Sequence, residues 1–152
     1  MNNITFDKNG MISDSDKIYE ELDQWYNEKE YDKIAAAVMD IPREHWSNKL
    51  WFRLISAYNN LKQFGKASEE LDAIYPRCDN PVDISHWHYM RGYILYVNRK
   101  HLMAIHCFED GLEADPNDSL GFELDKEIED ARVNIEKDIN TLRELSEKVT
   151  RD

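Results

Sequence analysis

Five histidines and two cysteines are the residues of this 152-residue chain that are best suited to binding a metal ion or moving a proton. His86 and His88 are two positions apart, so on a helix they point to different faces and cannot share a metal ion unaided. His101, His106 and Cys107 add possible ligands, but their spacing matches no recognised metal motif. Surface histidines, or histidines with satisfied hydrogen bonds, therefore explain this pattern better than a metal site does.

Other catalytic signatures are also missing from the sequence. It contains no glycine-rich phosphate loop, no nucleophile elbow and no HExxH motif. The many carboxylates are spread over segments with helical patterning, where solvated charge is the usual role. We expect a protein that is not an enzyme and that uses no cofactor and no metal.

The charge of the chain excludes several classes of partner. Asp and Glu outnumber Lys and Arg by 31 to 19, which gives a net charge of −12 and disfavours nucleic acid and anionic membranes. The N-terminal residues lack the features of a signal peptide, and no apolar run is long enough to span a membrane. Two cysteines, Cys78 and Cys107, are too few for a disulfide framework. These features together predict a cytoplasmic location.

The elements that would have to position a binding site are helices. With 5 Gly and 4 Pro, and with apolar residues at spacings of three and four, the chain predicts helix pairs in three units, about 14–46, 47–83 and 84–118. Candidate N-caps are Asp14 to Asp16 for the first unit, Ser47 or Asn48 for the second and Ser85 for the third, whose first helix would begin at His86. Residues 1–13 are expected to form a flexible lead-in or to tuck against the first helix. Residues 119–152 are expected to form one long helix.

The three units repeat. Trp25 aligns with Tyr58 at an offset of 33 residues, and Tyr58 aligns with Leu95 at an offset of 37. The longer offset is explained by extra residues in the connection at 78–83. A period of roughly 34 residues with two short helices is that of the tetratricopeptide repeat, and about three units are needed to share a core.

The third unit resembles a tetratricopeptide repeat (TPR), here of the small bacterial type, most closely. It matches the signature positions of the family with Gly92, Ala104, Phe108 and Pro116, although Gly111 stands where alanine is usual. The second unit matches with Trp51, Leu54, Tyr58, Ala67 and Leu71, and departs from the pattern at Ile55 and Asp79; the first keeps Leu22, Trp25, Ile34 and Val38. The resemblance covers residues 15–118. It implies an all-α fold, an α-α superhelix (TPR-like solenoid) of three helix pairs with a long C-terminal capping helix.

The resemblance also implies a function, which is protein–protein interaction through a concave groove lined by the first helix of each pair. The matching positions are Tyr19, Asp23, Tyr26, Asn27, Lys49, Phe52, Arg53, Ser56, Asn59, Asn60, His86, Tyr89, Met90, Tyr93 and Tyr96. We expect a scaffold or adaptor that holds a peptide or a partner helix there, although several of these aromatics could instead pack against neighbouring helices. The lysine and asparagine places that grip a terminal carboxylate in part of the family hold Tyr19, Asp23, Phe52 and Ser56, so an apolar, mixed or basic peptide is the expected ligand.

Two other functions remain open at this point. Small acidic TPR proteins also resemble secretion-type chaperones that shield the apolar segments of their partners. Alternatively, the C-terminal helix could join two copies into a homodimer, because apolar residues recur along it at spacings typical of a coiled-coil seam: Ile128, Ile135, Leu142, Leu145 and Val149.

Overall fold

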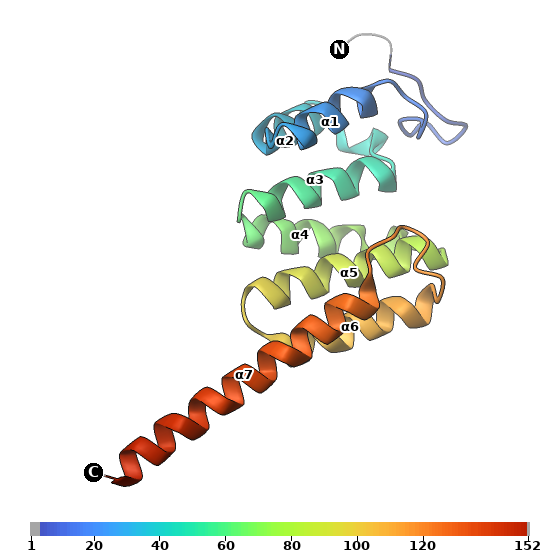
Figure 1. The fold of residues 1–152 in the computed structure, drawn as a ribbon. Coiled ribbons are helices and arrows are strands. Elements are labelled where there is room, and N and C mark those ends of the chain that lie inside the picture. The colour runs from blue at the N-terminus through green and yellow to red at the C-terminus, as the bar shows by residue number, and fades with distance from the viewer. Residues whose placement is uncertain (1–3, 152) are drawn as a thin grey trace. The chain divides into compact units, whose positions relative to one another are not determined.

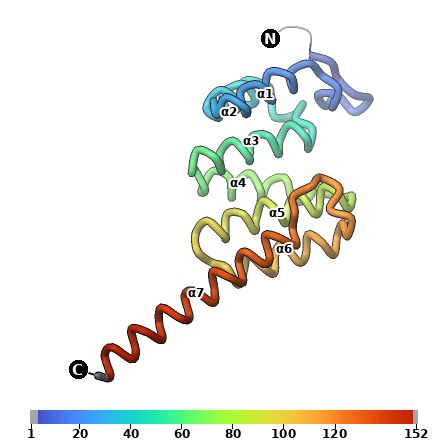
Figure 2. The backbone as a smooth tube through the Cα atoms, in the orientation of Figure 1, coloured from blue at the N-terminus to red at the C-terminus, as the bar shows by residue number. Residues whose placement is uncertain are grey.

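The computed structural model describes residues 4–151, so that residues 1–3 of the predicted lead-in and residue 152 of the predicted C-terminal helix lie outside the described residues (Figures 1 and 2). Residues 4–151 hold seven α-helices, two short 3-10 helices and one isolated β-bridge between Phe6 and Ile12. The predicted all-α fold is confirmed. Two compact units make up the chain, Met1–Cys78 (unit 1) and Asp79–Asp152 (unit 2).

Unit 1 contains two helix pairs, α1 (Ile18–Asn27) with α2 (Tyr31–Met39) and α3 (Asn48–Asn60) with α4 (Phe64–Ile74). Each of these helices packs against the next along the chain, as Figure 1 shows. Their apolar stripes form one core, in which the buried side chains include Leu22, Ile34, Val38, Leu54, Ile55, Leu71 and Ile74. Helices of 9 to 13 residues are marginal in water on their own, so this burial is what keeps them folded.

Unit 2 contains the third helix pair, α5 (Pro81–Val97) and α6 (His101–Ala114), and the long helix α7 (Leu124–Arg151). α6 packs against both α5 and the first half of α7. The core of unit 2 is made of Leu95, Ala104, Ile105, Phe108, Leu124, Ile128 and Ala131. The second half of α7 runs on past this core (Figure 1).

The turn inside each helix pair has the same backbone geometry in all three pairs. Lys29, Lys62 and Arg99 lie in the left-handed region, with φ of 59°, 60° and 62°. The amide of the next residue donates in each case to the carbonyl five residues back, over 2.8 Å to Trp25, 2.9 Å to Tyr58 and 2.8 Å to Leu95. The three left-handed residues are separated by 33 and 37 positions, as are the aligned residues Trp25, Tyr58 and Leu95. The repeat is therefore a backbone repeat as well as a sequence pattern.

Two helices begin elsewhere than the sequence predicts. α5 begins at Pro81, because the side chain of Asn80 caps it by accepting from the Asp83 amide at 2.9 Å and proline is favoured in the first turn; the proposed cap Ser85 is buried inside the helix. α7 begins at Leu124 rather than near Ser119. The Asp118 carboxylate accepts from the amides of Phe122 and Leu124 at 3.1 and 3.0 Å and holds the preceding residues in a turn.

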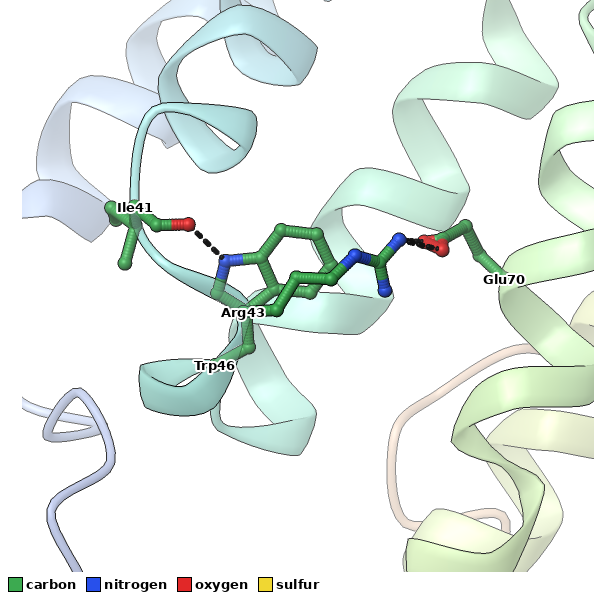
Figure 3. A network of polar contacts seen from close by, with 4 residues as sticks. All are labelled: Ile41, Arg43, Trp46 and Glu70. Carbon is green, nitrogen blue, oxygen red and sulfur yellow. Dashed lines mark hydrogen bonds and ion pairs between the residues drawn. The ribbon is translucent and has the colours of Figure 1, made fainter.

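The connection between α2 and α3 contains the 3-10 helix η1 (Arg43–His45) and carries a polar network, drawn in Figure 3. The fully buried Trp46 donates from Nε1 to the Ile41 carbonyl at 2.8 Å. The Arg43 guanidinium lies 4.4 Å from the centre of the Trp46 ring and donates to Oε2 of Glu70 on α4 at 2.7 Å. Glu70 is buried, so this ion pair ties the connection to the second helix pair.

Residues 5–16 of unit 1 are folded onto the same connection. Ile12 is fully buried, and its amide donates to the His45 carbonyl at 2.7 Å. Asp16 is also buried and accepts from the Thr5 amide and hydroxyl, at 2.5 and 2.9 Å, and from the Ile18 amide at the start of α1. Burial alone would raise the pKa of the Asp16 carboxyl, but these hydrogen bonds outweigh it and hold the pKa below its usual value.

The left-handed turns generate a stability prediction. Lys62→Gly should raise the free energy of unfolding by about 0.5–1 kcal/mol, because glycine adopts a positive φ without the steric cost that other residues meet. Lys66→Gly, four residues on and inside α4, should lower it by about 1 kcal/mol through lost helix propensity. Urea denaturation followed by circular dichroism measures both. Changes of the same sign in the two variants would contradict this account of the turn.

The close approach of α5 to α6 generates a second stability prediction. A Cβ on Gly92 would lie 2.5 Å from Cε1 of the buried Phe108, so Gly92→Ala should cost about 1–3 kcal/mol of stability by overpacking. Gly65→Ala is the matched control, because its Cβ would meet nothing within 4 Å, and it should be neutral or stabilising by up to about 1 kcal/mol. Thermal denaturation compares the two. Equal effects would mean that Phe108 moves aside without cost.

Candidate partner-binding face

The predicted partner-binding face takes its residues from α1 and α3 in unit 1 and from α5 in unit 2. In unit 1 the structure brings four of them together. The Arg53 guanidinium on α3 forms an ion pair with Asp23 on α1. Lys49 Nζ lies 4.1 Å from the centre of the Tyr19 ring, and the Arg53 guanidinium lies 5.8 Å from it. A buried aromatic ring of α1 therefore lies beneath two cations of α3.

Tyr19 is held at this place by its hydroxyl as well. The ring is almost fully buried, and its oxygen lies 3.2 Å from Oγ of Ser47, the residue that caps α3 by accepting from the Leu50 amide. Burial raises the pKa of Tyr19 to about 12, although the hydrogen bond with Ser47 acts in the opposite direction. The hydroxyl is therefore protonated over the physiological range, and α1 is joined to the start of α3.

The other predicted residues of unit 1 differ in how much they offer to a partner. Tyr26 is 45 % exposed and meets Tyr31 edge to face, with ring centres 5.6 Å apart. Asn27 is exposed, whereas Ser56 and Asn60 are half-buried and the Asn60 amide donates to the Ser56 carbonyl at 2.8 Å. Phe52 and Asn59 are buried. Without a rearrangement, a partner can reach the first of these residues but not the last two.

In unit 2, three of the five predicted residues contact the segment that leads into and forms α7. Tyr89 stacks on Phe122 with ring centres 4.0 Å apart, and His86 lies 5.0 Å from the same ring. The Tyr96 hydroxyl accepts from the side-chain amide of Asn134 at 2.9 Å, and the Tyr96 ring meets His101 edge to face. Met90 is buried and Tyr93 is half-buried. The aromatic surface of α5 is thus used in part to hold the C-terminal segment.

The residues that the sequence assigned to packing differ in exposure. The buried ones are Trp51, Leu54, Ala67, Leu71, Gly92, Ala104 and Phe108; Tyr58 is half-buried and Pro116 is exposed. Gly111, where the family usually has alanine, lies so that a Cβ would be 3.2 Å from Leu124 Cδ1, at the start of α7. This proximity gives a physical reason for glycine there.

Among residues 4–151, no group of three or more His, Cys, Asp or Glu residues could hold a metal ion. Cys78 and Cys107 are not joined by a disulfide bond, and burial raises the pKa of the Cys107 thiol. No helix in the described part of the chain is long and apolar enough to cross a membrane.

Two features of this face escaped the sequence interpretation. One is the placement of Lys49, which lies over Tyr19 and also donates to the Asp14 carbonyl at 2.8 Å. The other is the role of Phe122, which has no counterpart in the repeat pattern. Spacing along the chain gives no signal for either, because both contacts join residues about 30 positions apart.

The buried Tyr19 generates a pH prediction. Its pKa is raised from about 10 in the unfolded chain to about 12, so its contribution to stability is complete below pH 10 and is lost as the pH rises through 12. The stability difference between the wild type and Tyr19→Phe should therefore change, against the wild type, between about pH 10 and 12. Urea denaturation across this range measures it, with Tyr26→Phe as the exposed control. A difference that does not vary with pH would contradict the assigned burial.

Comparison with known proteins agrees with this architecture. No family model matches the chain, and no curated protein sequence matches it. Among solved structures, the NMR structure of the first TPR domain of the human RPAP3 protein is similar, with a TM-score of 0.62 and 20 % sequence identity; the match covers 80 % of this chain and 91 % of that chain. The fold of this chain is TPR-like, and residues 4–151 form six helices in three pairs followed by a long seventh helix, α7.

Proposed function

We propose that the chain is a protein–protein interaction module that holds a peptide or a partner helix against the partner-binding face, as a scaffold or adaptor. The observation that carries the proposal is the joining of α1 and α3 into one surface by Tyr19, Asp23, Lys49 and Arg53. A TPR-like fold supports it, because such arrays commonly present the first helix of each pair to a partner. The groove itself belongs to the proposal.

The chemistry of the face favours a partner with mixed character. Its cations already have partners, since Arg53 pairs with Asp23 and Lys49 donates to the Asp14 carbonyl. Tyr26 supplies an exposed ring that combines apolar area with a hydrogen-bonding tip. The net charge of −12 would steer a basic segment toward the chain. We therefore propose an aromatic or apolar anchor residue flanked by basic residues as the ligand.

A second candidate function is that of a homo-oligomerising subunit, and the exposed second half of α7 favours it. The five residues predicted for this contact divide into two groups. Ile128 is buried in the core of unit 2 and Ile135 is half-buried, whereas Leu142, Leu145 and Val149 are exposed. Only the second group is fully available to another molecule.

A binding experiment tests the first proposal. Peptides selected from a random display library against the immobilised chain should bind Tyr26→Ala at least about tenfold more weakly than the wild type, because truncating an aromatic anchor commonly costs more than 1 kcal/mol. Tyr75→Ala is the matched control, since Tyr75 is 55 % exposed, Tyr26 is 45 % exposed, and Tyr75 lies outside the predicted face. Isothermal titration calorimetry measures both affinities.

Circular dichroism of both variants checks that the helices remain. Equal weakening by Tyr26→Ala and Tyr75→Ala would contradict the assigned face. Selection of no binding peptide at all would count against the interaction function.

A further inference from the structure

Contact between α7 and the rest of unit 2 ends near Asp138. The side-chain amide of Asn134 donates to the Tyr96 hydroxyl at 2.9 Å. One turn further along α7, Asp138 forms an ion pair with Arg99 at 2.7 Å. All twelve residues from 139 to 150 are exposed. We refer to residues 139–150 as the helix extension.

The extension carries an apolar stripe. Ile139, Leu142, Leu145 and Val149 follow one another at spacings of three and four, which places them on one side of the helix. Together they are the largest group of exposed apolar side chains on any one helix of the described chain. A helical segment of twelve residues without neighbours is marginal in water, so a covering partner would stabilise both the stripe and the helix.

The charge of the extension indicates which partner fits. Its two basic residues, Arg143 and Lys148, balance its two acidic residues, Glu144 and Glu147, whereas the chain as a whole has a net charge of −12. A strongly basic partner would find its attraction elsewhere on the molecule, and a second copy of this acidic chain would meet the least repulsion at the extension.

We propose that two copies of the chain pair through their extensions in antiparallel orientation, with the two-fold axis near Leu142. Leu142 then faces its own copy, Leu145 faces Ile139 of the second copy, and Val149 faces the half-buried Ile135. Each exposed apolar residue of the stripe meets an apolar residue. This inference rests on the second candidate function, self-association through α7, and specifies its surface and its orientation.

The antiparallel orientation follows from where the charge lies. Residues 139–152 hold three basic and three acidic residues, so the entire net charge of −12 belongs to residues 1–138. Parallel pairing would bring two such portions together at one end of the seam. Antiparallel pairing places them at opposite ends, beyond the screening length of roughly 8–10 Å, and also opposes the two helix dipoles favourably.

The pairing is weak by construction, because only about four turns from each copy take part. We expect a dissociation constant on the order of 10⁻⁴ M, in the range of small transient interfaces. The wild-type chain should therefore change from monomer to dimer between about 5 µM and about 500 µM in sedimentation velocity.

A pair of leucine variants tests the surface. Leu142→Gln removes the central apolar side chain, keeps good helix propensity, and should weaken dimerisation at least about tenfold. Leu102→Gln is the matched control, because Leu102 on α6 is 62 % exposed, Leu142 is 66 % exposed, and Leu102 lies outside the stripe; it should dimerise like the wild type. Circular dichroism checks that both variants remain helical.

A distance measurement tests the orientation. A nitroxide on Asp130→Cys, in a chain with Cys78→Ser and Cys107→Ala, places each label twelve residues from the two-fold axis. Pulsed electron resonance at high concentration should report about 36 Å, from a rise of 1.5 Å per residue. Parallel pairing would give less than about 25 Å, because paired helix axes lie only about 10 Å apart.

The outcomes separate the two proposals. A wild-type chain that stays monomeric to about 500 µM overturns self-association and this inference together. A dimer that Leu142→Gln does not weaken, or that Leu102→Gln weakens as much, overturns the extension as its surface. A dimer that depends on Leu142 but shows the short label distance leaves self-association standing and overturns the antiparallel orientation.

Discussion

Burial of one apolar stripe per helix against the neighbouring helices of the same unit is the constraint on which this structure depends. Helices as short as α2, with nine residues, gain too little from their own hydrogen bonds to persist alone. Each therefore folds only together with its neighbours in the same unit. α5 approaches α6 closely at Gly92, where an added Cβ would lie 2.5 Å from Cε1 of Phe108. α7 obeys the constraint as far as Asp138 and departs from it afterwards.

Much of the fold could be predicted because this constraint leaves a periodic trace. The sequence alignment placed Trp25, Tyr58 and Leu95 at equivalent positions. In the structure, the carbonyls of these three residues accept the equivalent hydrogen bond in the three turns. The predicted starts of α5 and α7 were wrong. A helix start depends on which side-chain carboxylate or amide accepts a hydrogen bond from a free backbone N–H, and several side chains near Pro81 and Ser119 could do so. Periodicity reports burial, but it does not report such local competition.

The exposure of the residues proposed for partner binding was harder to predict than the fold, for a related reason. A helix position follows from sequence, whereas its exposure depends on the neighbours that cover it. Tyr89 and Tyr96 look alike in the sequence as binding residues, but the segment containing Phe122 and Asn134 contacts both. Tyr26 meets Tyr31 edge to face and remains 45 % exposed. Hence α1 and α3 present the more open surface, and α5 has a divided role.

The left-handed residues of the three turns bear on how such a chain can change over time. The backbone there demands a dihedral angle, and two lysines and an arginine meet it without glycine. Many residue types can adopt this dihedral angle at a modest cost in stability. Substitutions can therefore accumulate at the turn while the two helices of the pair remain joined in the same way. Sequence similarity to related proteins is therefore lost at these positions sooner than the backbone conformation of the turn.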